Sequence, residues 1–102
     1  MKKKAALADD LIDDPHNLRD QPIWVYSGVL DTVVMPGVVD FVPKVYRYWG
    51  ANVQYINYLQ GEHTFPTDLS RNHNSCSFLG TPYIANCHWD GAGSLLKKVI
   101  PN

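Results

Sequence analysis

Two residues that could support acid–base chemistry, Asp31 and His63, each follow a short apolar run, 23–26 and 53–59 respectively. In α/β sheets, functional residues lie just past the carboxyl ends of the strands. Adjacent parallel strands would bring both following loops to one edge of the sheet. A carboxylate held against imidazole Nδ1 fixes the ring tautomer and stabilises the imidazolium that forms in turnover. The spacing therefore predicts an acid–histidine pair.

The elements that must position this pair can be predicted from the apolar pattern. Residues 23–26 and 53–59 are rich in β-branched and aromatic side chains and are predicted to be buried strands. Residues 38–49 have apolar side chains at helical spacing, and Gly50 is a natural C-terminal stop. Pro43 falls inside this pattern, so either the helix kinks there or Pro43 lies in the first turn of a shorter helix.

A terminal helix is predicted over 91–100, with Asp90 as its N-cap and Pro101 as its end. Strand–helix–strand at this spacing is one right-handed crossover of a parallel sheet, so the fold class is α/β. Two parallel strands leave faces and edges uncovered, and we therefore expect a partial domain over 1–102. Its expected divisions are a polar lead-in (1–21), the strand–helix–strand unit with the acid loop (22–59), a histidine and cysteine loop (60–89) and the C-terminal helix (90–100).

Composition excludes several classes of partner. The 102 residues are 45% hydrophobic and 19% charged, with a net charge of −1 and no basic stripe, which argues against nucleic-acid binding. No window approaches the roughly 18 apolar residues of a membrane span. The run after the lysines 2–4 is too short for the apolar region of a signal peptide, so we expect no export signal within these residues.

The two cysteines, Cys76 and Cys87, lie in a stretch rich in Ser, Asn, Gly and Pro. A disulfide closing a surface loop is the favoured interpretation, and it would imply an oxidising compartment. Two unpaired thiols remain an alternative. A zinc site recruiting His73 and His88 is disfavoured, because adjacent Cys87 and His88 are poor ligands for a closed tetrahedral site. No metal and no cofactor is expected.

The remaining histidines and aromatic residues receive structural interpretations. We expect His16, His73 and His88 to be solvated loop residues. We expect Tyr83 and Trp89, near the cysteines, to pack in the core rather than face a substrate. Four further aromatic residues are predicted to be core from their strand or helix positions: Trp24, Tyr26, Trp49 and Tyr55.

Four collinear segments of the sequence form a pattern. They are Ile12-Asp13 with Asn17-Leu18; Val25-Tyr26-Ser27-Gly28-x-x-Asp31-Thr32-Val33-Val34; Asn52-Val53-Gln54-Tyr55 with Gly61-x-His63-Thr64-Phe65-Pro66-Thr67-Asp68; and Asn86-Cys87-x-x-Asp90-Gly91-Ala92-Gly93. In these segments, over about residues 10–102, the sequence resembles the C-terminal portion of the poly(3-hydroxybutyrate) depolymerase-type esterases of the α/β-hydrolase superfamily.

The resemblance implies an extracellular hydrolase that cleaves ester bonds of polyhydroxyalkanoates. It makes Asp31 the triad acid, His63 the general base, and Cys76 and Cys87 a family disulfide. The order acid-then-histidine is the one α/β-hydrolases use after their serine.

The sequence departs from the family pattern at the nucleophile. No Gly-x-Ser-x-Gly elbow occurs here, and the oxyanion-hole segment is absent as well. We therefore expect the C-terminal part of a polyester esterase that lacks its serine and is inactive alone. A non-enzymatic remnant or binding module of the same fold is the alternative, as is part of a short-acyl or feruloyl esterase.

Overall fold

The computed structural model describes residues 12–71 and 74–101. Its elements follow the order that the sequence predicts, with three short additions. In chain order they are the 3₁₀ turn η1 (Pro15–Leu18), β1 (Pro22–Tyr26), α2 (Pro36–Val39), α3 (Phe41–Tyr48), β2 (Asn52–Ile56), β3 (Phe65–Thr67), β4 (Ile84–Asn86) and α4 (Gly91–Val99).

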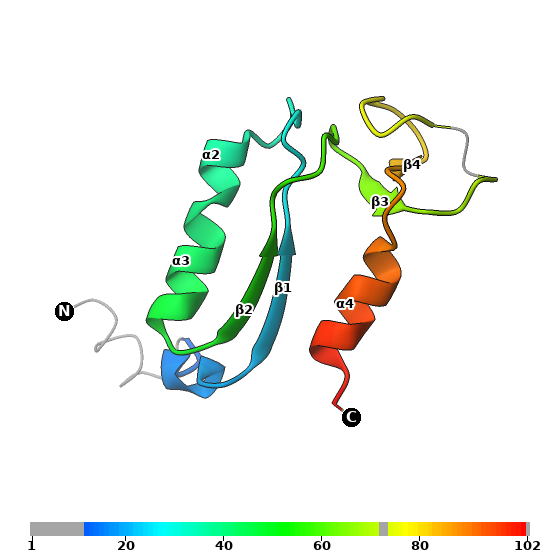
Figure 1. Ribbon diagram of the computed structural model, residues 1–102. Helices are drawn as coiled ribbons and strands as arrows, with labels where there is room; N and C mark the ends of the chain where they lie inside the picture. The colour runs from blue at the N-terminus through cyan, green and yellow to red at the C-terminus, as the bar shows by residue number, and fades with distance from the viewer. Residues whose placement is uncertain (1–11, 72–73, 102) are drawn as a thin grey trace.

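Strands β1 and β2 pair in parallel, from Pro22 opposite Asn52 to Tyr26 opposite Ile56. The second strand is shorter than predicted, because residues 57–59 leave the ladder. Ser27 N donates to Ile56 O, but the next backbone donor, Val29 N, reaches Leu59 O and so skips two acceptors. The loops after β1 and β2 therefore leave the sheet side by side at the same end (Figure 1).

The predicted helix over 38–49 is divided into α2 and α3 at Asp40. Pro36 begins α2, and Pro43 is the third residue of α3. The missing N–H of a proline costs no intrahelical bond in the first turn, which explains the shorter second helix. Gly50 follows with φ 84°, a left-handed conformation that glycine adopts without strain, and it ends the helix as predicted.

Helix α4 begins at the predicted cap, where Gly93 N donates to Asp90 Oδ1 at 2.9 Å. It ends at Val99, one residue earlier than predicted. Trp24 Nε1 donates to Ser94 Oγ at 3.0 Å and so ties α4 to β1. Helix α3 lies on one side of the β1–β2 pair and α4 on the other (Figure 1).

The segment 60–89, expected to be a loop throughout, contains a second parallel pair. Phe65–Thr67 pairs with Ile84–Asn86, with Pro66 opposite Ala85. Strands of three residues are too short for an alternating pattern, so the apolar periodicity gave no sign of them. This pair packs against the start of α4 and fixes the chain that follows His63.

The core of the described residues is small. Ile56 and Ala85 are 2% and 0% exposed, and the largest fully buried side chains are Pro43 and Pro66. The aromatic residues predicted to be core, Trp24, Tyr26, Trp49 and Tyr55, are half-buried. Several large apolar side chains of α2 and α3 are exposed: Val38, Phe41, Val42, Val45 and Tyr48. The structure is thus a partial α/β fold. Within its described part, none of the helices is long and apolar enough to cross a membrane.

Candidate functional site

The acid loop (residues 27–35) folds around the carboxylate of Asp31. Asp31 N donates to Gly28 O at 3.2 Å, which closes a tight turn after β1. Asp31 Oδ1 accepts from Val33 N and Val34 N, both at 2.8 Å. Oδ1 is therefore used in hydrogen bonds within the acid loop, and Oδ2 is available to a residue from another loop.

That partner comes from the histidine loop (residues 57–64). His63 Nδ1 lies 3.1 Å from Asp31 Oδ2. The Asp31 side chain is 9% exposed, whereas the His63 side chain is 44% exposed. The structure thus brings the two predicted residues together, with the acid buried behind the ring and the imidazole open to solvent.

The surroundings of Asp31 favour its ionised form. Burial raises the pKa of Asp31, but the hydrogen bonds from Val34 N, His63 and Val33 N together outweigh burial and lower the pKa below 3.8. A carboxylate in this position can keep a proton on Nδ1, which leaves Nε2 as the imidazole nitrogen able to accept one. The arrangement suits His63 to act as a general base.

Apolar side chains surround the pair. A hollow of about 330 Å³ contains Asp31 and His63, and its other walls are Tyr26, Val34, Val39, Thr64, Phe65 and Tyr83. A second hollow, of about 340 Å³, adjoins His63 between Val33, Leu79 and Tyr83. Volumes of this size and apolar walls with a few polar groups are typical of sites for small organic ligands.

Tyr83 contradicts its predicted core position. It is 48% exposed, and its ring stands edge-on to the His63 imidazole at 6.3 Å between centroids. The cysteine loop turns it outward, which a sequence pattern cannot show. Trp89 is half-buried against Tyr58 and lines a different hollow with Asp90.

The disulfide predicted between Cys76 and Cys87 is present. Because both sulfur atoms are in the bridge, neither is a free thiol or a metal ligand. The alternatives of two unpaired thiols and of a zinc site are therefore wrong. His73, which the zinc alternative required, lies outside the described residues. Cys76 O accepts from Glu62 N at 2.9 Å, so the bridged loop also holds the residue next to His63.

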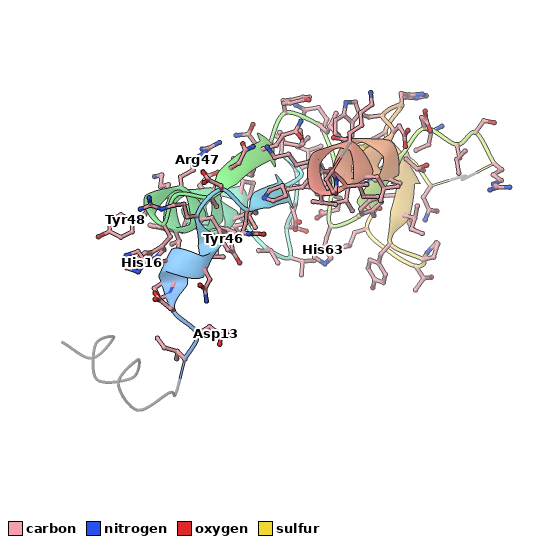
Figure 2. All side chains as sticks on the ribbon, turned by 90° about the horizontal axis from the view of Figure 1, so that it is seen from below. Asp13, His16, Tyr46, Arg47, Tyr48 and His63 are labelled. Atoms are coloured by element: carbon pink, nitrogen blue, oxygen red, sulfur yellow. A yellow bond between two sulfur atoms is a disulfide. The ribbon has the colours of Figure 1, made fainter. Side chains whose placement is uncertain are left out.

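The other described histidines lie away from the pair. His16 is exposed within η1, and in Figure 2 it lies near Tyr48 and well apart from His63. His88 is exposed, as predicted. Among residues 12–71 and 74–101, no group of three or more His, Cys, Asp or Glu side chains is arranged to hold a metal ion.

Sequence reasoning missed Glu62. Its side chain is buried and contacts both loops of the site. The only available signal was its place next to His63 in a stretch of few charges.

Comparison with known proteins decides what this arrangement resembles. The chain is 40% identical over 86 residues to a polyhydroxybutyrate (PHB) depolymerase of Talaromyces funiculosus, which covers 81% of this chain and 25% of the relative. It is 38% identical over 91 residues to a poly(3-hydroxybutyrate) depolymerase of Delftia acidovorans, covering 87% of this chain and 18% of the relative. The chain is similar to the C-terminal portion of PHB depolymerases.

The fold agrees with this similarity. A solved PHB depolymerase variant, complexed with an R3HB trimer, matches with a TM-score of 0.79 and 35% identity over 89% of this chain. The match covers 30% of that depolymerase, and the sequence matches cover 25% and 18% of the two relatives, so the chain spans less than a third of the length of each protein it matches. No family model matches the chain.

Proposed function

We propose that this chain supplies the acid and the general base of a serine esterase that cleaves a PHB-type polyester. The observation that carries the proposal is the contact of 3.1 Å between Asp31 Oδ2 and His63 Nδ1 at the edge of an apolar hollow. The similarity to PHB depolymerases supports the substrate class, as does the R3HB trimer in the matching structure.

The mechanism requires groups that these 102 residues do not offer. A serine would attack the ester carbonyl, and His63 would take its proton and return it to the leaving alcohol while Asp31 orients the ring. The sequence contains no Gly-x-Ser-x-Gly elbow to present such a serine. We place the nucleophile and the oxyanion donors in sequence beyond these residues, which makes the chain inactive alone.

The surroundings of the site agree with an extracellular ester hydrolase. Val34, Phe65 and Tyr83 give the hollow the apolar walls that a polyester chain of short hydroxyacids requires. The Cys76–Cys87 disulfide is typical of proteins from oxidising compartments, which favours secretion.

A chimaeric enzyme tests the proposal. The full 102-residue chain replaces the matching segment of the Talaromyces funiculosus depolymerase, and hydrolysis of PHB granules and of p-nitrophenyl butyrate is measured. We expect an active chimaera in which Asp31→Asn lowers kcat by about 10⁴-fold, as loss of the triad acid does elsewhere. His63→Ala should abolish activity, and His16→Ala serves as the matched control that retains it.

Four results would contradict the proposal. Activity that survives His63→Ala would remove His63 from the mechanism. Ester hydrolysis by the 102-residue chain alone would place the nucleophile within it. An inactive but folded chimaera would favour a non-enzymatic remnant of the fold, and cleavage of p-nitrophenyl butyrate without PHB would favour a short-acyl esterase.

A further inference from the structure

Glu62, the only glutamate in the sequence, joins the acid loop to the histidine loop. Its Oε1 accepts from Thr32 N at 2.6 Å and from His63 N at 2.9 Å. Its Oε2 accepts from Thr32 Oγ1, also at 2.6 Å. Glu62 as a whole residue is only 8% exposed, so water competes little for these hydrogen bonds.

The groups that donate to Glu62 belong to the backbone that carries the acid–histidine pair. Thr32 directly follows Asp31, and the other backbone donor is the N–H of His63 itself. Each bond therefore fixes the backbone at or next to one member of the pair. The Asp31 and His63 side chains can meet only if these two backbone segments keep their separation.

At positions further from the pair, backbone hydrogen bonds join the two loops. Val29 N donates to Leu59 O and Leu30 N to Gly61 O, both at 2.9 Å. Among the described residues, no backbone hydrogen bond joins the two loops beyond Leu30. At Thr32 the loops are joined instead by a hydrogen bond from Thr32 N to the Glu62 carboxylate. Glu62 thus holds the part of the acid loop that carries the catalytic carboxylate.

An ionised carboxylate suits this place well. Three donors converge on its two oxygens, and a carboxylate offers only acceptors there. Hydrogen bonds, chiefly from the Thr32 side chain, lower the pKa of Glu62 against the opposing effects of burial and of the Asp31 charge. A glutamine that keeps its oxygen on the two backbone donors turns its NH₂ group toward Thr32 Oγ1. The hydroxyl must then accept rather than donate, and the bonds to a charged acceptor are lost.

We infer that Glu62 is a positioning residue for the esterase reaction, which acts by holding Asp31 Oδ2 against His63 Nδ1. This inference rests on the proposed roles of Asp31 and His63. Glu62 does not touch the reacting atoms, and its effect passes through the geometry of the pair. In intact enzymes, a misplacement of about 1 Å in such a group costs about 100-fold in rate.

Proton NMR of the full 102-residue chain tests the inference without any need for activity. An imidazole Nδ1–H that donates to a carboxylate gives a strongly downfield resonance, which His63→Ala assigns and Asp31→Asn removes. We expect Glu62→Gln to shift this resonance upfield or abolish it. Thr32→Val deletes only the bond to Oε2, so it should cause a smaller shift in the same direction, and it carries the test if Glu62→Gln fails to fold.

The matched control is Asp40→Asn, which also removes a carboxylate that accepts a short side-chain bond, but from Tyr55 and outside both loops. It should leave the resonance in place at a comparable cost in thermal stability. In the chimaeric enzyme, Glu62→Gln should lower kcat by up to about 100-fold while KM changes by less than about twofold.

The outcomes separate this inference from the proposed function. An unchanged resonance in folded Glu62→Gln, together with loss of the resonance in Asp31→Asn, would overturn the role of Glu62 and leave the acid–histidine pair intact. A wild-type resonance that Asp31→Asn does not affect would overturn the pair and, with it, both proposals.

Discussion

Gly28 lies directly against Gly61, where the acid loop and the histidine loop meet. A Cβ atom at position 28 would overlap the carbonyl of Gly61, and it would also crowd the carbonyl of Glu62. Gly28 is buried, and Leu30 N donates to Gly61 O just beyond it. The close approach of these two backbones sets how near Asp31 and His63 can come.

Gly28→Ala should therefore separate the two loops. We expect a loss of about 1–3 kcal/mol in the free energy of unfolding, typical of an overpacked site, and loss of the Asp31–His63 contact. Urea unfolding measures the first and the downfield Nδ1–H resonance of His63 the second. The matched control is Gly37→Ala in α2, because a Cβ there meets no atom within 4 Å. Alanine should be neutral or stabilising in that helix. Equal behaviour of the two variants would contradict the prediction.

The Cys76–Cys87 disulfide should contribute a large share of the stability, because the buried core is small. A bridge that closes a loop of this size stabilises by about 3 kcal/mol through the unfolded state. We expect the double variant Cys76→Ser, Cys87→Ser to unfold at correspondingly lower urea. Reduction of the wild-type chain should reproduce this loss, and the double variant should not respond to reductant. An unchanged midpoint in both experiments would contradict this role of the bridge.

The acid–histidine contact could be predicted because it depends only on topology. Asp31 and His63 each follow a strand, and parallel neighbours deliver their following loops to one edge of the sheet. The prediction did not require any knowledge of how the side chains pack. A shorter second helix with Pro43 in its first turn was one of the two predicted possibilities, because a proline limits where a helix can start.

Glu62, Tyr83 and the β3–β4 pair could not be predicted in this way. The role of Glu62 depends on the reach of one side chain across two loops, and Tyr83 faces outward because of the path of the bridged loop. The strands β3 and β4 are too short to show a period. These features arise from tertiary contacts rather than from local pattern.

The lowered pKa of Asp31 makes the stability of the fold depend on pH. A group whose pKa is lower in the folded state stabilises the fold above its ordinary value of 3.8, and this contribution is lost as the pH falls through the lower folded value. We expect the free energy of unfolding of the wild type to decline below about pH 4 more steeply than that of Asp31→Asn. Urea unfolding at a series of pH values from 5 downward measures both slopes. If both free energies of unfolding declined in parallel, the pKa of Asp31 would be the same in the folded and unfolded states, which would contradict the prediction.

Tyr55 provides the opposite dependence at high pH. Burial, followed by its hydrogen bond of 2.6 Å to Asp40 Oδ1, raises the pKa of Tyr55 to about 12. A raised pKa means that the neutral phenol stabilises the fold below its ordinary value of 10, and that this contribution is lost as the pH rises through about 12. Burial also raises the pKa of Tyr26, so ultraviolet titration of tyrosinate should show both groups ionising after the exposed tyrosines. Tyr55→Phe should remove the Tyr55 part of this late ionisation and leave that of Tyr26.

Asp40→Asn should move the ionisation of Tyr55 to lower pH, because it removes both the carboxylate acceptor and its charge. The step should not reach the ordinary value, since burial is the larger cause and remains in the variant. Asp40 is the N-cap residue of α3, whereas Tyr55 lies on β2, so this bond links the helix start to the strand that leads to His63. If Tyr55 ionised together with the exposed tyrosines in the wild type, the bond between helix and strand would not form in solution.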